Sequence, residues 1–189
     1  MILSILICTL PERKEMFEDL IKKIAEQEIL EYAGLVEVCV HNGGRNEYTT
    51  GEKRNELLSY AKGKYCVFVD DDDEVPPYYI EELFKASHSD ADCLAINGTM
   101  TTNGVNEKQW FIGLGNPYIA DYSTGKEIYL RPPNHITPMK TEIARHVGFK
   151  GITIGEDYDF CMRLKESGLL KTQYVIEKPM YHYKFIENK

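Results

Sequence analysis

Four consecutive aspartates, Asp70 to Asp73, are the residues of this chain best suited to chemistry. They follow the apolar run 67–69, which has the composition of a buried strand, and Glu74 extends the acidic cluster. Two like charges about 4 Å apart repel by about 4 kcal/mol at an effective dielectric near 20. Such crowding favours a bound divalent cation, Mg²⁺ or Mn²⁺, which prefers oxygen ligands. The alternative is a solvated acidic turn that caps the helix expected after Pro76 and Pro77.

The elements that must position these aspartates alternate between buried strands and amphipathic helices. The segments, in chain order, are strand 2–8, helix 16–24, strand 35–40, a helix around 57–61, strand 65–69, helix 77–87, strand 93–96, helices 141–147 and 159–167, and strand 175–176. This alternation predicts the α/β class, with a Rossmann-like, mostly parallel sheet and helices on both faces. Ligands of such sheets bind at the carboxyl ends of the strands, where the aspartates lie.

The segment 97–134 has weaker periodicity and is rich in Gly, Asn, Tyr and Thr. Residues 110–112 and 127–130 are candidate strands, with Ser123-Thr124-Gly125 as the turn of a hairpin between them. We expect this segment at a sheet edge or over a cleft.

Composition limits the class of protein. A chain of 189 residues with 43% hydrophobic and 28% charged residues is typical of one globular domain. The net charge of −8 argues against a nucleic-acid groove, which needs clustered Lys and Arg. Five cysteines without CxxC spacing lie mostly in apolar runs and predict a reduced, cytoplasmic setting. The run 2–8 has neither the length of a membrane span nor the flanks of a signal peptide, so no transmembrane segment is expected.

Four segments occur in a fixed order along the chain and together resemble family 2 glycosyltransferases. They are Pro11-Glu12-Arg13 after the first strand, Lys53-Arg54-Asn55, Asp70-Asp71-Asp72-Asp73, and Gly155-Glu156-Asp157-Tyr158-Asp159-Phe160. The resemblance implies a single GT-A domain over 1–189, with a nucleotide-sugar-binding half at 1–96 and an acceptor-binding half at 97–189. In that fold a nucleotide-sugar lies across the strand ends, and a divalent cation bridges its diphosphate.

The Asp-x-Asp motif of the family assigns roles on the donor side. Asp70 would contact the ribose or the metal, and Asp72 would hold the metal. Asp71 stands at the variable position beside the nucleotide-sugar, and period two turns its carboxylate to the other face of the extended chain. Arg54 would pair with diphosphate or nucleotide oxygens, which guanidinium binds in a bidentate manner. Outside this pattern Arg54 is typical of an exposed helix residue, and Asn55 would fix the neighbouring loop.

The nucleobase would lie against the end of the first strand, near Thr9, Pro11 and Arg13. Family members commonly have an Asp after the second strand that contacts the base, whereas this chain has Asn42. An amide offers both a donor and an acceptor, so Asn42 retains the ability to contact a base. The family points to a UDP-linked donor, with a hexosyltransferase-like activity.

On the catalytic side, Asp157 resembles the inverting base that removes the proton of the acceptor hydroxyl. Glu156 would orient it or act in its place. An acidic pair that opens a helix is also a common N-terminal device without a catalytic role. The acceptor would be a saccharide or another hydroxyl compound.

Two histidines and the Trp are further candidates for the site. His182 would contact the metal or the diphosphate, as a late histidine does in several GT-A enzymes, or would be a packed residue. His135 is a candidate on the acceptor side. Trp110, the only Trp, would stack on a sugar face or belong to the core.

Two other functions compete with glycosyl transfer. A non-catalytic carbohydrate- or nucleotide-sugar-binding protein would typically lack Asp72 or Asp157, and both are present. A metal-dependent phosphatase needs a nucleophile motif that Asp70 to Val75 fits poorly. The donor sugar and the acceptor depend on the shape of the loops around 97–134, and the sequence specifies no oligomeric state.

Overall fold

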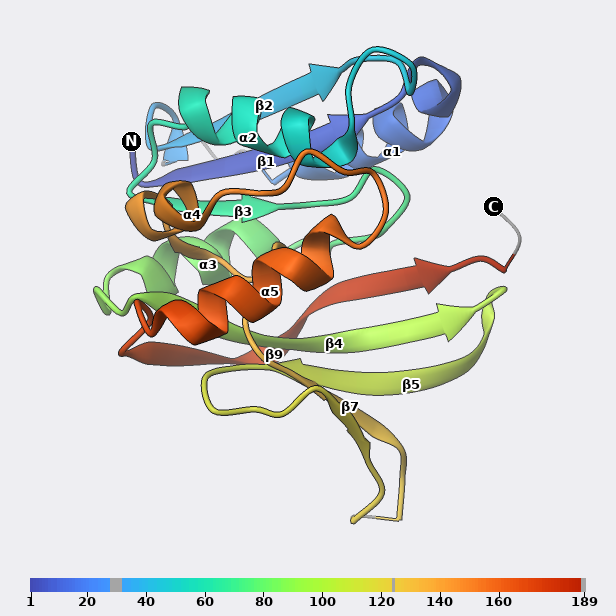
Figure 1. Ribbon diagram of the computed structural model, residues 1–189, viewed down its shortest axis with the longest axis vertical. Helices are drawn as coiled ribbons and strands as arrows, with labels where there is room; N and C mark the ends of the chain where they lie inside the picture. The colour runs from blue at the N-terminus through green and yellow to red at the C-terminus, as the bar shows by residue number, and fades with distance from the viewer. Residues whose placement is uncertain (28–31, 124, 188–189) are drawn as a thin grey trace.

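The computed structural model describes residues 1–27, 32–123 and 125–187 and shows one mixed sheet between two layers of helices (Figure 1). The strands are β1 (Leu3–Thr9), β2 (Val36–Asn42), β3 (Tyr65–Phe68), β4 (Cys93–Thr102), β5 (Val105–Ile112), β6 (Ile119–Asp121), β7 (Ile128–Arg131), β8 (Met139–Lys140) and β9 (Gln173–Phe185). The helices are α1 (Lys14–Ala25), α2 (Thr50–Tyr60), α3 (Tyr79–Ser87), α4 (Thr141–Val147) and α5 (Glu156–Ser167), and a 3₁₀ turn, η1 (Pro11–Arg13), precedes α1. The predicted α/β class is confirmed.

The first half of the sheet is parallel. β1 lies between β2 and β3, and the register pairs Thr9 with Asn42 at the end of the β1–β2 ladder. Nearly every side chain of β1 is buried, as expected for a central parallel strand covered on both faces. Because parallel strands end at the same edge, Thr9, Asn42 and the aspartates after β3 meet there.

Antiparallel strands complete the sheet. The strand order is β2-β1-β3-β8-β4-β5-β7-β6, and β9 joins through β4. β8 runs antiparallel to both β3 and β4, and β4 and β5 form an antiparallel pair. β9 lies parallel to β4 over nearly its whole length, which the two-residue strand predicted at 175–176 understates. The register shifts near Pro179 interrupt the periodicity that reveals a long strand.

The predicted hairpin between 110–112 and 127–130 is wrong. β5 and β7 are parallel neighbours, and the antiparallel partner of β7 is the three-residue strand β6. So short a strand has no period to detect. Thr124, at the centre of the predicted turn, lies outside the described residues. β6 and β7 form an arm that projects from the lower edge of the sheet, as expected for an edge position (Figure 1).

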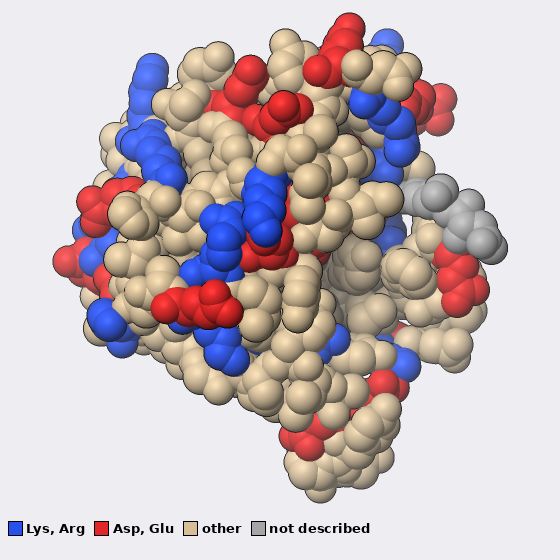
Figure 2. Space-filling model, viewed as in Figure 1, with Lys and Arg blue, Asp and Glu red and all other residues tan. Residues whose placement is uncertain are grey.

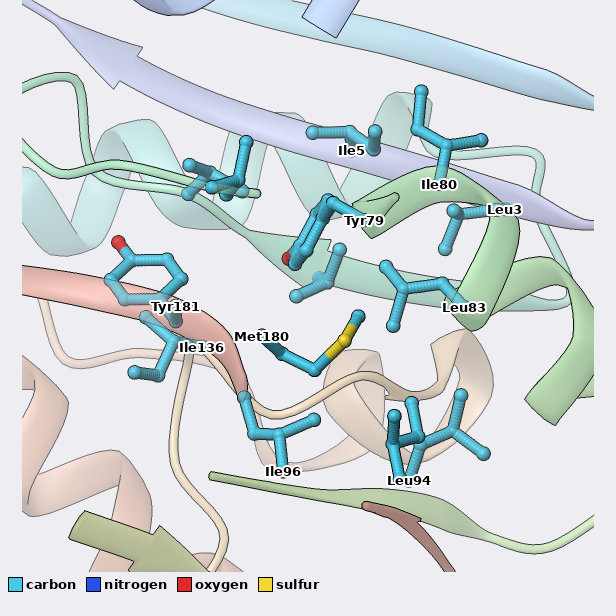
Figure 3. Close-up of a cluster of buried hydrophobic side chains, with 14 of the residues drawn as sticks. Leu3, Ile5, Tyr79, Ile80, Leu83, Leu94, Ile96, Ile136, Met180 and Tyr181 are labelled. Carbon is cyan, nitrogen blue, oxygen red and sulfur yellow. The ribbon is translucent and has the colours of Figure 1, made fainter. Parts of the chain in front are cut away.

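Two apolar cores hold the helices against the sheet. One core joins α1 and α3 to the sheet, and the other joins α2, α4 and α5 to its opposite face (Figure 1). In the first core, Ile80 and Leu83 lie one helical turn apart on α3 and pack near Leu94 and Met180 (Figure 3). Helices therefore cover both faces, as predicted.

The surface carries both signs of charge. On the face shown in Figure 2, Lys and Arg are interspersed with Asp and Glu and form no single basic patch. Within the described ranges, no helix combines the length and apolar character needed to cross a bilayer.

Gly98 lets β4 and β9 approach closely behind the strand ends. A Cβ atom at this position would lie 2.0 Å from the backbone oxygen of Tyr181 and 2.5 Å from the Trp110 ring. The Trp110 indole also donates a hydrogen bond to the Thr99 carbonyl (2.9 Å). This packing fixes the position of Tyr181 relative to the sheet.

We expect Gly98→Ala to lower the free energy of unfolding by about 3 kcal/mol, because the added methyl must displace backbone. Gly44→Ala is the control, since its Cβ would meet only the Glu47 side chain at 3.6 Å. Urea unfolding followed by circular dichroism measures both changes. Equal midpoints for the two variants would contradict the close packing at Gly98.

Candidate active site

A cavity of about 890 Å³ lies at the edge of the sheet where β1 and β3 end. Of the residues singled out in the sequence, the following line it: Thr9, Arg13, Arg54, Asp70, Asp71, Asp72, Trp110, His135, Glu156 and Asp157. Segments from both halves of the chain therefore meet at one site. The lining contains several carboxylates and several cations, which lie close together.

Asp70 contacts two side chains from distant segments. Its Oδ1 lies 3.2 Å from Arg54 Nη2, and its Oδ2 lies 3.1 Å from His135 Nε2. Burial raises the pKa of Asp70, but His135 and Arg54 outweigh burial and hold the pKa below its ordinary value. Asp70 is therefore an anion at neutral pH.

Arg54 links the strand end to helix α5. Its side chain is 5% exposed and also lies 3.4 Å from Glu156 Oε1. The guanidinium lies over the rings of Phe68 and Phe149, which contact each other edge to face, with Cζ 5.3 and 5.4 Å from the ring centroids. Burial raises the pKa of Glu156, and Arg54 opposes that rise. The guanidinium thus neutralises carboxylates on both sides of the cavity.

Helix α2 positions Arg54 through its own start and through a neighbouring loop. Thr49 and Glu52 form a capping box that fixes the helix start. Asn55 bonds both the N–H and the carbonyl of Phe149 (2.8 Å each), which confirms the expectation that it fixes a loop. Gly51 N–H donates to the Ile152 carbonyl (3.0 Å). Helix α2 therefore also positions the segment that leads into α5.

Asp71 contacts residues at the end of β1. Thr9 Oγ1 donates to Asp71 Oδ2 and Arg13 Nη1 lies beside Asp71 Oδ1, both at 2.7 Å. The partners of Asp71 thus differ from those of Asp70. Residues 70–73 form a turn, in which the Asp73 N–H donates to the Asp70 carbonyl (3.2 Å), and not the extended chain that the sequence suggests. Asp72 is half-buried, and its Oδ2 lies 3.4 Å from Arg13 Nη1. The η1 turn delivers this arginine to both carboxylates.

Asp73 connects the acidic cluster to the last strand. Tyr181 Oη donates to Asp73 Oδ2, and Lys184 N–H donates to Asp73 Oδ1, both at 2.8 Å. The Asp70 N–H in turn donates to Tyr181 Oη (3.1 Å). Burial and the nearby Asp70 raise the pKa of Asp73 well above its ordinary value. This role of Tyr181 is not visible in the sequence, because a tyrosine in an apolar run is typical of a core residue.

Lys53 is a second residue of the site whose role the sequence did not indicate. Its buried Nζ donates to the Thr9 carbonyl (3.0 Å) and to the Gly43 carbonyl, and so joins the ends of β1 and β2. Burial lowers the pKa of Lys53. Its position directly before Arg54 in the Lys53-Arg54-Asn55 motif was the one feature of the sequence that pointed to this role.

Helix α5 presents its first-turn acids in different ways. Gly155 has φ of 79°, a left-handed conformation that favours glycine, and it starts the helix at the cavity. Glu156 is buried beside Arg54, whereas the half-buried Asp157 lines the cavity. Asp159 lies in ion pairs with Arg163 (2.6 Å) and Lys150 and does not line the cavity. Asp157 is thus the acid of this turn best placed to meet a ligand.

Three predicted residues do not line the cavity. Pro11 and Asn42 are exposed next to it. His182 lies on β9 with Nδ1 2.7 Å from Thr99 Oγ1 and Nε2 3.3 Å from Thr101 Oγ1. Both ring nitrogens thus face hydroxyls of β4, and the structure does not bring this ring to the aspartates. The neighbours of His182 reach the site instead.

The carboxylates are the groups that could hold a metal ion. Asp70 and Asp72 supply oxygen donors, which match the preference of Mg²⁺ and Mn²⁺. Among the described residues, no cluster of three or more His, Cys, Asp and Glu side chains has the arrangement of a complete metal site. Mg²⁺ commonly binds through one or two carboxylates and takes its other ligands from water and substrate phosphates. The donor chemistry therefore fits a cation that binds together with a diphosphate.

The arrangement of the sheet and helices is that of the GT-A fold. Residues 37–148 match the model of the family described as glycosyl transferase family 2, which is more than half of the chain. The chain belongs to this family. No curated protein sequence matches it significantly.

Several solved structures share the fold. S. aureus TarS has a TM-score of 0.65 at 15% identity, over 97% of this chain and 37% of that one. The structure of S. aureus TarS 1-349 in complex with UDP-GlcNAc has a TM-score of 0.65 at 15% identity, over 100% of this chain and 60% of that one. The complex of TarS 1-349 with UDP has a TM-score of 0.62 at 14% identity, again over 60% of that chain. This chain thus spans between 37% and 60% of the length of these structures.

We expect Arg54→Met to lower the free energy of unfolding at pH 7 by about 3 to 5 kcal/mol, because it removes the cation that the buried Glu156 and the partly exposed Asp70 share. Arg54 lowers the pKa of both acids, so its contribution is present above their unfolded pKa and is lost as the pH falls. The deficit of the variant should therefore shrink toward pH 4. Urea unfolding of the wild type and the variant between pH 7 and pH 4 measures this deficit.

The double variant Arg54→Met/Glu156→Gln is the control, since it removes one of the two uncompensated charges. It should recover part of the lost stability at pH 7. A deficit that is independent of pH and unrelieved in the double variant would show that Arg54 acts by packing against its two aromatic neighbours.

Proposed function

We propose that this protein transfers a sugar from a nucleotide-diphosphate sugar, UDP-linked, to an acceptor hydroxyl. One observation carries the proposal. A single cavity brings Asp70 and Asp72, at the strand end, together with Asp157 at the start of α5. Asp70 and Asp72 are suited to bind a metal and a diphosphate, and Asp157 is suited to act as a base. Membership of glycosyl transferase family 2 supports the same reaction.

The donor would lie across the ends of β1 and β3, with its base near Thr9 and Arg13. UDP is favoured because the similar TarS structures were obtained with UDP-GlcNAc and with UDP. In this proposal residues 1–96 mainly bind the nucleotide-sugar and 97–189 mainly bind the acceptor. His135 and Lys184 come from the second part but contact the acidic loop, so the donor site uses both parts.

Asp72 would hold a divalent cation, with Asp70 as a second ligand or a contact to the ribose. A cation bound there would neutralise charge that develops on the departing nucleoside diphosphate. Asp70 lies beside Arg54 and His135, so its negative charge is already balanced by the protein. Arg13 would contribute positive charge beside the diphosphate.

Asp157 would take the proton of the acceptor hydroxyl as its oxygen attacks the anomeric carbon. The bond to the diphosphate breaks on the opposite side, which gives inversion of configuration. Glu156 is less suited to this step because it is buried against Arg54, and it would instead hold the start of α5 in place. The acceptor would be a saccharide or another hydroxyl compound.

If Asp72 holds the cation, Asp72→Asn should weaken UDP binding in Mn²⁺ at least about tenfold, a loss of about 1.4 kcal/mol. The substitution should also remove most of the difference between the UDP affinity measured with Mn²⁺ and that measured with a chelator. Asp19→Asn, on the exposed face of α1, is the matched control and should bind like wild type. Titration calorimetry measures all three proteins. Unchanged affinity and unchanged Mn²⁺ dependence in Asp72→Asn would refute the metal assignment.

Asp157→Asn should bind UDP but transfer sugar about 10² to 10⁴ times more slowly, the usual contribution of a positioned base. Glu166→Gln, on the exposed side of the same helix, should retain its rate. The assay follows UDP release from UDP-sugars with a panel of saccharide acceptors, and NMR of the product gives the anomeric configuration. Full activity in Asp157→Asn would exclude it as the base, and retention of configuration would exclude the inverting step.

A further inference from the structure

We propose that Tyr118, with Arg131 and Tyr158, forms a subsite that binds the ring of a neutral saccharide beside Asp157. The inference rests on the proposed function, because it names the class of acceptor for that reaction. In this subsite Tyr118 takes the stacking role for which the sequence suggests Trp110.

Two half-exposed tyrosines contact each other beside the cavity, and one of them lines it. Tyr118 precedes β6 at the base of the arm and lines the cavity, and its ring contacts Tyr158 with centroids 5.3 Å apart at 87°. Tyr118 is 49% exposed and Tyr158 51% exposed. Since Tyr158 follows Asp157 on α5, the pair connects the arm to the helix that carries the proposed base.

Arg131 supports Tyr118 from the last residue of β7. Its Cζ lies 4.1 Å from the centroid of the Tyr118 ring and 5.0 Å from that of Tyr129. Its Nη1 donates to the carbonyls of Ile119 (2.6 Å) and Leu130 (2.8 Å), which fixes the guanidinium at the cavity wall. A side chain fixed before binding loses less conformational entropy when a ligand arrives.

This combination suits a saccharide. A pyranose ring presents a face of C–H groups, which packs on an aromatic ring, and hydroxyl groups, which accept hydrogen bonds from a guanidinium. An acidic acceptor is disfavoured here, because the Asp157 carboxylate lies next to Tyr158 in the chain and would repel it, whereas Glu156 is ion-paired with Arg54. The subsite therefore favours a neutral sugar.

Trp110 does not offer a comparable surface. Its side chain is 6% exposed, and its ring packs against Tyr181 with centroids 6.2 Å apart. Its indole N–H already donates to the Thr99 carbonyl. Trp110 is therefore a largely buried part of the cavity wall, whereas Tyr118 lines the same cavity with a half-exposed ring.

The test measures saccharide binding directly. Saturation-transfer NMR is recorded with methyl glycosides of glucose, galactose and N-acetylglucosamine, with and without UDP and Mn²⁺. Wild type should show saturation of ring protons for at least one glycoside. Tyr118→Ala and Tyr158→Ala should each reduce that signal at least fivefold, whereas Tyr118→Phe, which keeps the ring, should restore it.

Tyr122→Ala is the matched control. Tyr122 is 64% exposed on the same arm but does not line the cavity, so its variant should keep the wild-type signal. Thermal unfolding by circular dichroism identifies any variant that fails to fold, and Tyr158→Ala tests the subsite without a change to the arm.

The subsite is refuted if no glycoside binds to wild type, or if folded Tyr118→Ala and Tyr158→Ala both keep the signal. A loss of signal that Tyr122→Ala shares would refute it as well. Failure of the proposed function has a different signature, since UDP with Mn²⁺ would then not bind to wild type in calorimetry while the glycosides still did.

Discussion

The site depends on how the fold neutralises crowded carboxylates. Asp70, Asp71 and Asp73 lie within four residues of each other, and the two carboxylates of Asp70 and Glu156 share one buried guanidinium. An uncompensated buried charge costs several kcal/mol, so each acid needs a partner from another element. Arg54 of α2, Arg13 of η1 and Tyr181 of β9 supply them. The acidic loop thereby requires these elements to converge on one edge of the sheet.

That requirement explains why segments from both parts of the chain meet at the site. β1, β2 and β3 bring their ends together by parallel register, and Lys53 ties two of those ends through backbone carbonyls. The mixed second half returns through β9 so that Tyr181 and Lys184 reach Asp73. The long parallel ladder of β9 on β4, made possible by the close approach at Gly98, holds this connection in place.

The sequence predicts those parts of the fold that leave a periodic signal. The strands of the first half and the helices on both faces follow from apolar runs and helical spacing, and the acidic strand end stands out by charge. β6 and β8 are too short to show a period, and the register shift at Pro179 hides the length of β9. The motif likewise identifies Asp72 and Asp157. It does not show that Tyr118, a tyrosine in an irregular segment, lies near α5, because that contact depends on the packing of the arm.

Burial separates the acids of the site into two kinds. Asp71, Asp73 and Glu156 are buried and hydrogen-bonded or ion-paired to the protein, so their main effect is to fix its structure. Asp72 and Asp157 are half-buried in the cavity wall and can meet a ligand. Arg54 connects the two kinds, because it holds Asp70 next to Asp72 and Glu156 next to Asp157. A shift of this one guanidinium would displace both sides of the cavity, so the separation of Asp72 and Asp157 depends on a buried residue that pairs with the neighbours of both.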